Sequence, residues 1–149
     1  MADAKVTWYL EKVKVKIDAA TDEALAQVAF QIEAATKKNI INVNKQLDTG
    51  FMGASVYAKS KAKGSEYAEA RAEAETKTLS SKTGRVVDVS KRMAREETLP
   101  KSAGAAVVVG ANYAIYQEAQ QSFLYAAAVE VAATVKGTVE PVYRSKVND

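Results

Sequence analysis

The chain has 149 residues, with 21 basic and 18 acidic side chains and neither cysteine nor histidine. These absences exclude thiol nucleophiles, disulfides, Ser-His and Cys-His catalytic pairs, and zinc sites built on imidazole or thiolate. A net charge of +3 is too balanced to indicate nucleic-acid binding by itself. The length predicts a single domain over residues 1–149. Without an apolar N-terminal region or a run of about 18 apolar residues, we expect a soluble protein that lacks a secretion signal.

The hydrophobic period changes near residue 18. The stretch EKVKVKI, residues 11–17, alternates valine or isoleucine with lysine. This alternation predicts a half-buried strand whose lysine face is either solvated or in contact with a charged partner. Over residues 18–47 the apolar residues recur at three- and four-residue steps, which predicts an amphipathic helix capped by Asp18 or Thr21. Such a helix is roughly 40 Å long, and one side of it packs either in the core or on a neighbouring subunit.

A turn and a strand are expected in QLDTGFMGASVYAKSK, residues 46–61. Asp48, Thr49 and Gly50 are turn formers, and the glycine can adopt a positive φ. Residues 54–59 then alternate in the manner of a strand. Asp48 is interpreted as a turn residue rather than a catalytic carboxylate, because no second acid or base lies nearby in the motif.

Residues 60–104 are expected to form an extended inserted segment. Within it, GSEYAEARAEAETKTL predicts a polar helix and VVDV (residues 86–89) a short strand. From Lys59 to Lys101 the sequence contains eleven basic and seven acidic residues. Because large apolar residues are few, we expect this segment to be dispensable for folding, mobile when alone and ordered by a partner. Its candidate partner contacts are Lys59, Lys61, Arg71, Arg85, Lys91, Arg92 and Arg95.

The stretch VVVGANYAIYQEAQQSFLYAAAVEV, residues 107–131, holds four of the eleven aromatic rings of the chain. AAVVVG predicts a strand in the centre of a sheet, and Asn112 is a candidate cap for a short helix. Ser122 is expected to cap a last helix that ends near Lys136 and Gly137. Residues 138–149 are then a short strand or a C-terminal arm.

These elements predict an α+β fold. Its small mixed or antiparallel sheet is packed by a long N-terminal helix and a C-terminal helix. We expect about half of the four clustered rings to fix the last two helices to the sheet. The others would be available to a neighbouring molecule, since tyrosine keeps a polar end that suits a subunit boundary.

Two segments resemble the gene-product-ten-like tail-component family of long-tailed bacteriophages. The family turn and strand, D-T-G-x-L-x-x-S-I, is matched by Asp48, Thr49, Gly50, Met52, Ser55 and Val56. The second signature, V-G-x-N-x-x-Y-A-x-Y-x-E-x-G-T and P-F-L-x-P-A-L, is matched with one residue fewer after the asparagine. The matching residues are Val109, Gly110, Asn112, Tyr113, Ala114, Tyr116, Glu118, Phe123, Leu124 and Ala127. Gln120 and Gln121 replace the Gly-Thr pair, and Ser122 and Ala126 replace the two prolines.

The resemblance implies a non-enzymatic structural virion protein of the head–tail connection. Such a protein forms a neck, tail-completion or tail-terminator ring that joins the tail tube to the capsid connector. The implied partners are other copies of the chain, in a hexamer by analogy with the tail tube, and the neighbouring neck, connector and tail-tube proteins. Genomic DNA would pass through the ring, and assembly would occur in the host cytoplasm without a membrane. No cofactor or metal is expected, since no acidic loop has calcium-site spacing.

Two other classes of function are alternatives to a structural virion protein. A basic nucleic-acid-binding module would use the lysines and arginines of residues 59–101 and would bind with a steep salt dependence. No helix-turn-helix or RNA-binding signature supports it. A hydrolase built on two carboxylates needs an acid placed in an apolar pocket, and the sequence indicates no such pairing.

Overall fold

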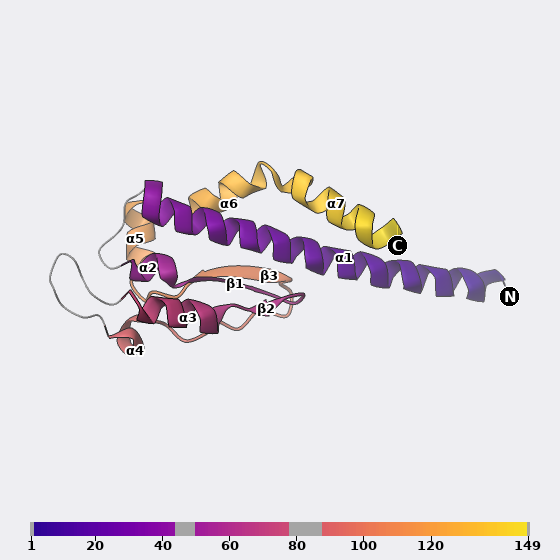
Figure 1. Ribbon diagram of the computed structural model, residues 1–149. Coiled ribbons are helices and arrows are strands. Elements are labelled where there is room, and N and C mark those ends of the chain that lie inside the picture. Colours follow the sequence, from indigo (N-terminus) through magenta and orange to yellow (C-terminus); the bar gives the residue numbers. More distant parts are fainter. Residues whose placement is uncertain (1, 44–49, 78–87, 149) are drawn as a thin grey trace.

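A long helix, a three-stranded sheet and several shorter helices make up the fold in a computed structural model that describes residues 2–43, 50–77 and 88–148 (Figure 1). This arrangement confirms the α+β class. In chain order the elements are α1 (Ala2–Lys38), the π-helical turn η1 (Asn39–Val43), α2 (Phe51–Ala54), β1 (Val56–Ser60), β2 (Gly64–Ser65), α3 (Tyr67–Glu75), α4 (Val89–Arg92), β3 (Ala105–Val109), α5 (Ala114–Gln120), α6 (Leu124–Ala132) and α7 (Val135–Asn148).

Helix α1 has 37 residues, which corresponds to a length of about 55 Å. The strand expected over residues 11–17 is wrong, because these residues belong to α1. Three alternating apolar residues do not outweigh the good helix formers around them, and a helix extends more easily than it begins. Thr21 does not cap the helix either, since it lies inside α1 and its Oγ1 donates to the carbonyl of Ile17. The expected helix end, at residues 46–47, lies outside the described residues.

The sheet has the order β2-β1-β3, with both pairings antiparallel. The register between β1 and β3 places Val56 opposite Val109 and Ser60 opposite Ala105. The expectation that residues 105–109 form a central strand is wrong, because β3 lies at an edge and β1 occupies the centre. All five residues of β3 are half-buried. The five consecutive apolar residues of β3 therefore indicate that both faces of the strand are partly covered, and not that the strand is central in the sheet.

The sheet lies between two layers (Figure 1). Helices α1, α6 and α7 are on one side, and α3 and α4 are on the other. On the α3 side, the hydroxyl of Tyr57 accepts a hydrogen bond from the Glu97 backbone N–H at 3.1 Å. The ring of Tyr57 meets that of Tyr67 edge to face, with ring centroids 5.3 Å apart. Residues of the inserted segment therefore cover this face of the sheet.

The hydrophobic core includes residues from the segment that we expected to bury little. Ala70 and Ala74 of α3 and Met93 after α4 belong to the same buried cluster as Phe51 and Phe123. The polar helix was expected correctly, but its alanine stripe is buried because small side chains allow the helix backbone to approach the sheet closely. Val89 lies in α4 and not in a strand; residues 86 and 87 are outside the described residues.

Helix α7 replaces the expected strand or arm. Lys136 and Gly137 lie inside α7 rather than at the end of the preceding helix, which stops at Ala132. Helix α7 packs along α1: the hydroxyls of Thr21 and Tyr143 share a hydrogen bond, and the Gln31 amide donates to Thr138 Oγ1 at 2.8 Å. The C-terminal residues thus add a third helix to the layer formed by α1 and α6.

Candidate functional site

The two segments that carry the family resemblance meet in space. The Gly110 backbone N–H donates to the Ser55 carbonyl at 2.9 Å, and the Ala111 N–H donates to Ser55 Oγ at 3.0 Å. A Cβ at position 110 would lie 2.7 Å from Met93 Sδ and 3.1 Å from the Ser55 carbonyl oxygen. A side chain here would displace the flexible end of Met93 and press on the Ser55 backbone, so glycine suits this close approach of the two backbones. Ser55 and Gly110 therefore hold together the beginning of β1 and the end of β3.

The neighbouring motif residues are also structural. Gly50 has a φ of +78°, which agrees with the expected turn, while Asp48 and Thr49 lie outside the described residues. Met52 is buried. Asn112 does not cap α5, because its side-chain amide donates to the Lys91 carbonyl at 2.6 Å and so connects α4 to the start of α5.

Glu118 organises the junction between α5 and α6. Its carboxylate accepts hydrogen bonds from the backbone N–H groups of Phe123, Leu124 and Tyr125 at 2.9 to 3.0 Å. It also accepts one from Ser122 Oγ at 2.9 Å. Ser122 in turn accepts from the N–H of Ala126 at 3.2 Å, so the expected Ser122 cap is present and is shared with Glu118. Burial by itself would raise the pKa of Glu118, but the hydrogen bonds outweigh burial and lower that pKa.

Replacing Glu118 with alanine is expected to lower the free energy of unfolding at neutral pH by about 0.5–2 kcal/mol, the usual effect of losing a helix cap. Because the folded-state pKa is lowered, this stabilisation is complete above the ordinary pKa of 4.5 and is lost as the pH falls through the folded-state value. Denaturant unfolding of wild type and Glu118→Ala between pH 7 and pH 3 tests this. Glu140→Ala, on α7, is the control. A difference that stayed constant down to pH 3 would contradict a role for the ionised carboxylate.

The four clustered rings divide between core and surface, as expected. Phe123 is buried and Tyr113 is half-buried, with its ring centroid 6.5 Å from that of Phe51. Tyr116 and Tyr125, by contrast, are 71% and 73% exposed. Two aliphatic side chains on the same helices are exposed as well. We call the exposed residues Ile115, Tyr116, Tyr125 and Val129 the α5–α6 apolar face.

An open groove of about 350 Å³ lies between α1, β3 and α6. We call it the apolar groove, because every side chain that lines it is apolar. The lining residues are Leu25, Val28, Ala29, Ile32, Ala105, Ala106, Val107, Leu124 and Ala128. The lining supplies no acid, base or nucleophile, so the groove is suited to binding rather than to chemistry. The sequence did not reveal it, because its walls come from three segments that are far apart along the chain.

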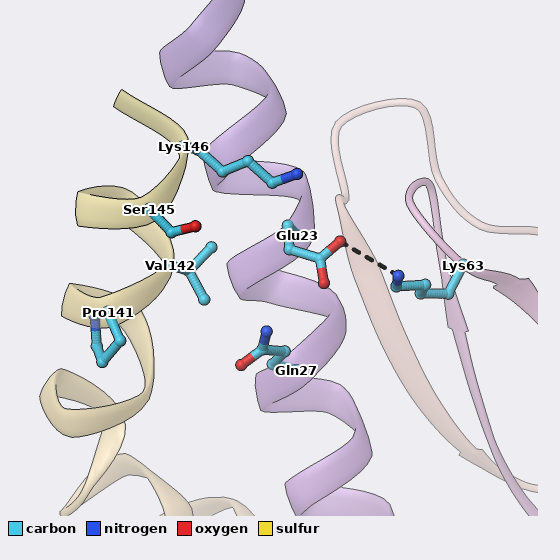
Figure 2. Close-up of a pocket in the computed structure, with 7 residues that line it drawn as sticks. All are labelled: Glu23, Gln27, Lys63, Pro141, Val142, Ser145 and Lys146. Carbon is cyan, nitrogen blue, oxygen red and sulfur yellow. Dashed lines mark ion pairs between the residues drawn. The ribbon is translucent and has the colours of Figure 1, made fainter. Parts of the chain in front are cut away.

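A more polar pocket lies between α1 and α7 (Figure 2). Its single carboxylate, Glu23, points toward Lys63, and the distance between Glu23 Oε2 and Lys63 Nζ is 3.5 Å. The wall contributed by α7 consists of Pro141, Val142, Ser145 and Lys146. This ion pair connects α1 to the turn between β1 and β2, and the pocket lining contains no second acid that could assist a reaction.

A carboxyl pair that the sequence did not reveal lies between α1 and α3. A hydrogen bond with Glu33 raises the pKa of Glu66, and burial raises it further. Glu33 also forms an ion pair with Lys37, with 2.8 Å between Oε1 and Nζ. Glycosidases separate their two carboxyl groups by roughly 5–9.5 Å, so that a sugar and water fit between them. Carboxyl groups that share a hydrogen bond leave no such space, and the pair therefore does not fit the hydrolase alternative.

Most of the candidate partner contacts are engaged within the chain. Lys59 Nζ lies 3.0 Å from Glu96 Oε1, and Lys61 donates to the Lys101 carbonyl at 3.3 Å. Arg71 pairs with Glu75, and the Arg92 guanidinium lies over the Tyr113 ring at 6.0 Å from its centroid. Lys91 and Arg95 are exposed, and Arg85 is outside the described residues.

Comparisons with protein-family models, with curated proteins and with solved structures found no match. Over residues 2–43, 50–77 and 88–148, no helix is both long enough and apolar enough to cross a membrane. The same residues contain no cluster of three or more acidic side chains placed to hold a metal ion. The candidate functional site comprises the apolar groove and the α5–α6 apolar face.

Proposed function

We propose that this chain is a structural subunit of a bacteriophage head–tail connection, and that it works by assembling with copies of itself into a ring. The observation that carries the proposal is the unpartnered apolar surface. All four side chains of the α5–α6 apolar face are more than half exposed. Exposed tyrosines are enriched at protein interfaces.

The family resemblance supplies the setting for this surface. Ser55 and Gly110, one from each of the two resembling segments, join β1 to β3, and Glu118 fixes the start of α6. These residues, which this chain shares with the family motifs, hold elements of the fold together, and a common fold would require them. Tyr116, in the same motif, is 71% exposed and therefore does not contribute to the core. Its position beside the fold-determining residues favours contact with another subunit.

The alternatives have less support. Four of the seven candidate phosphate-binding cations already have partners within the chain, so a nucleic-acid-binding module would have to break these contacts. The Glu33–Glu66 pair lacks the space between carboxyl groups that the hydrolase alternative requires. A virion ring requires neither free cations nor a reactive pocket.

Electron microscopy of phage particles whose genome encodes this chain tests the proposal. A ring of copies at the neck or at the end of the tail is expected, with six copies by analogy with the tail tube. A single copy per particle, or no copy in the particle, would rule the proposal out. Binding of the purified chain to short DNA duplexes, measured at increasing salt, is the parallel test for the nucleic-acid-binding alternative.

A further inference from the structure

The N-terminal part of α1 extends beyond the rest of the molecule (Figure 1). Thr21 is hydrogen-bonded to Tyr143 near the end of α7. Residues 15–19, one turn earlier, are all exposed. Val15 is 65% exposed and Ile17 is 42% exposed. We call residues 2–19 the projecting helix.

The sequence of the projecting helix has the apolar pattern of a helix that packs one face against another protein surface. Positions 6, 10, 13 and 17 carry valine, leucine, valine and isoleucine. At 3.6 residues per turn these positions form one line along the helix, and the line continues through positions 20 and 24. Ala20 and Ala24 are buried in the body of the molecule. In the sequence, the apolar line therefore continues N-terminally from the buried part of α1 and past the exposed Ile17.

The apolar groove offers the complementary surface. It runs beside α1 and is closed on its other sides by the edge strand β3 and by α6. Helix α6 carries one charged residue, Glu130, yet only Ala127 and Val131 are buried. A helix that is apolar all round is normally covered. An amphipathic helix laid in such a groove is a common mode of recognition.

We infer that the projecting helix of one copy docks into the apolar groove of a second copy. A molecule cannot fill its own groove in this way, because α1 is one continuous helix whose middle already forms a wall of that groove. Helix and groove are different surfaces, so the contact is heterologous and builds rings or open chains. The inference rests on the proposed function, in which copies of the chain form a ring, and it specifies the two surfaces that meet.

Cysteine pairs give a direct test, because the natural chain has no cysteine. Ile17→Cys marks the apolar line of the projecting helix, and Ala128→Cys marks the groove. The two single variants, mixed at high concentration with a short bismaleimide, are expected to give a covalent dimer that neither variant gives alone. A chain that carries both cysteines is expected to give a ladder whose largest species reports the number of copies. Lys136→Cys, on α7 and outside the groove, replaces Ala128→Cys as the matched control.

A second pair of variants separates docking from folding. Ile17→Glu changes an exposed position, so its thermal unfolding should match that of wild type. Its self-association should weaken by at least about tenfold, because docking would bury a carboxylate in an apolar groove. Lys136→Glu is the control for added negative charge.

Three results would overturn the inference: no cross-link between the two marked surfaces, cross-linking of Ile17→Cys to itself, or equal cross-linking to Lys136→Cys. A ring in phage particles without the ladder would leave the proposed function standing and show that other surfaces build the ring. A ladder without a ring in particles would leave the docking standing and remove the virion function. A partner other than a second copy would be indicated if phage particles contained the chain with its projecting helix cross-linked to a different protein only.

Discussion

Replacement of Phe123 with alanine is expected to lower the free energy of unfolding by about 3–5 kcal/mol, which is the range for a large aromatic removed from a packed core. Phe123 is 1% exposed and belongs to the main core cluster. It stands directly before α6, where its carbonyl accepts a hydrogen bond from the buried Asn39 amide at 3.1 Å. The cavity would therefore open beside η1, at the junction between α5 and α6. Urea denaturation followed by circular dichroism measures the loss.

Tyr125 provides the matched control two residues along the chain. Its ring is 73% exposed, so Tyr125→Ala should change the free energy of unfolding by no more than about 0.5 kcal/mol. If the α5–α6 apolar face is an interface, the same variant should reduce self-association. Similar losses of stability from both variants would contradict the division of the aromatic cluster between core and surface.

The parts of the fold that were predicted correctly depend on local signals. Gly50 follows turn chemistry, and the strand at residues 56–60 follows from alternation next to that turn. Residues 105–109 were recognised as a strand because they are β-branched and apolar, but their place at the edge depends on pairing with distant residues. The alternation in residues 11–17 misled for a related reason. A period of two indicates a strand only when a neighbouring strand exists to pair with it.

The candidate site shows the same limit. The exposure of Tyr116 and Tyr125 could be anticipated because the aromatic cluster contained more large rings than two short helices can bury. The role of Glu118 could have been found from its spacing, since an acid four to seven residues before a helical run can accept from the free N–H groups there. The apolar groove and the Glu33–Glu66 pair could not have been found from the sequence. Each consists of side chains that only the tertiary structure brings together.

Excision of residues 62–101, with a short Gly-Ser bridge in their place, is expected to abolish cooperative unfolding. Sequence alone suggested the opposite. The structure places Ala70, Ala74 and Met93 in the core cluster, and the excision would also remove the Tyr67 ring from Tyr57. Changes in loop closure are small by comparison, at about 0.6 kcal/mol per doubling of length. Differential scanning calorimetry of the excised chain would test this, and a sharp transition near that of wild type would contradict it.

Two point variants locate the effect within the segment. Met93 is 8% exposed, and its Sδ lies where Gly110 leaves room for it. Met93→Ala should therefore lower the free energy of unfolding by about 2–5 kcal/mol. Arg95 is exposed two residues later, and Arg95→Ala should stay within about 0.5 kcal/mol of wild type. If Met93→Ala were as stable as Arg95→Ala, the segment would be peripheral to the fold and the excised chain should fold. If only Met93→Ala is destabilised, residues 62–101 are part of the folded domain. Their exposed cations do not contribute to the core and remain available to bind a partner.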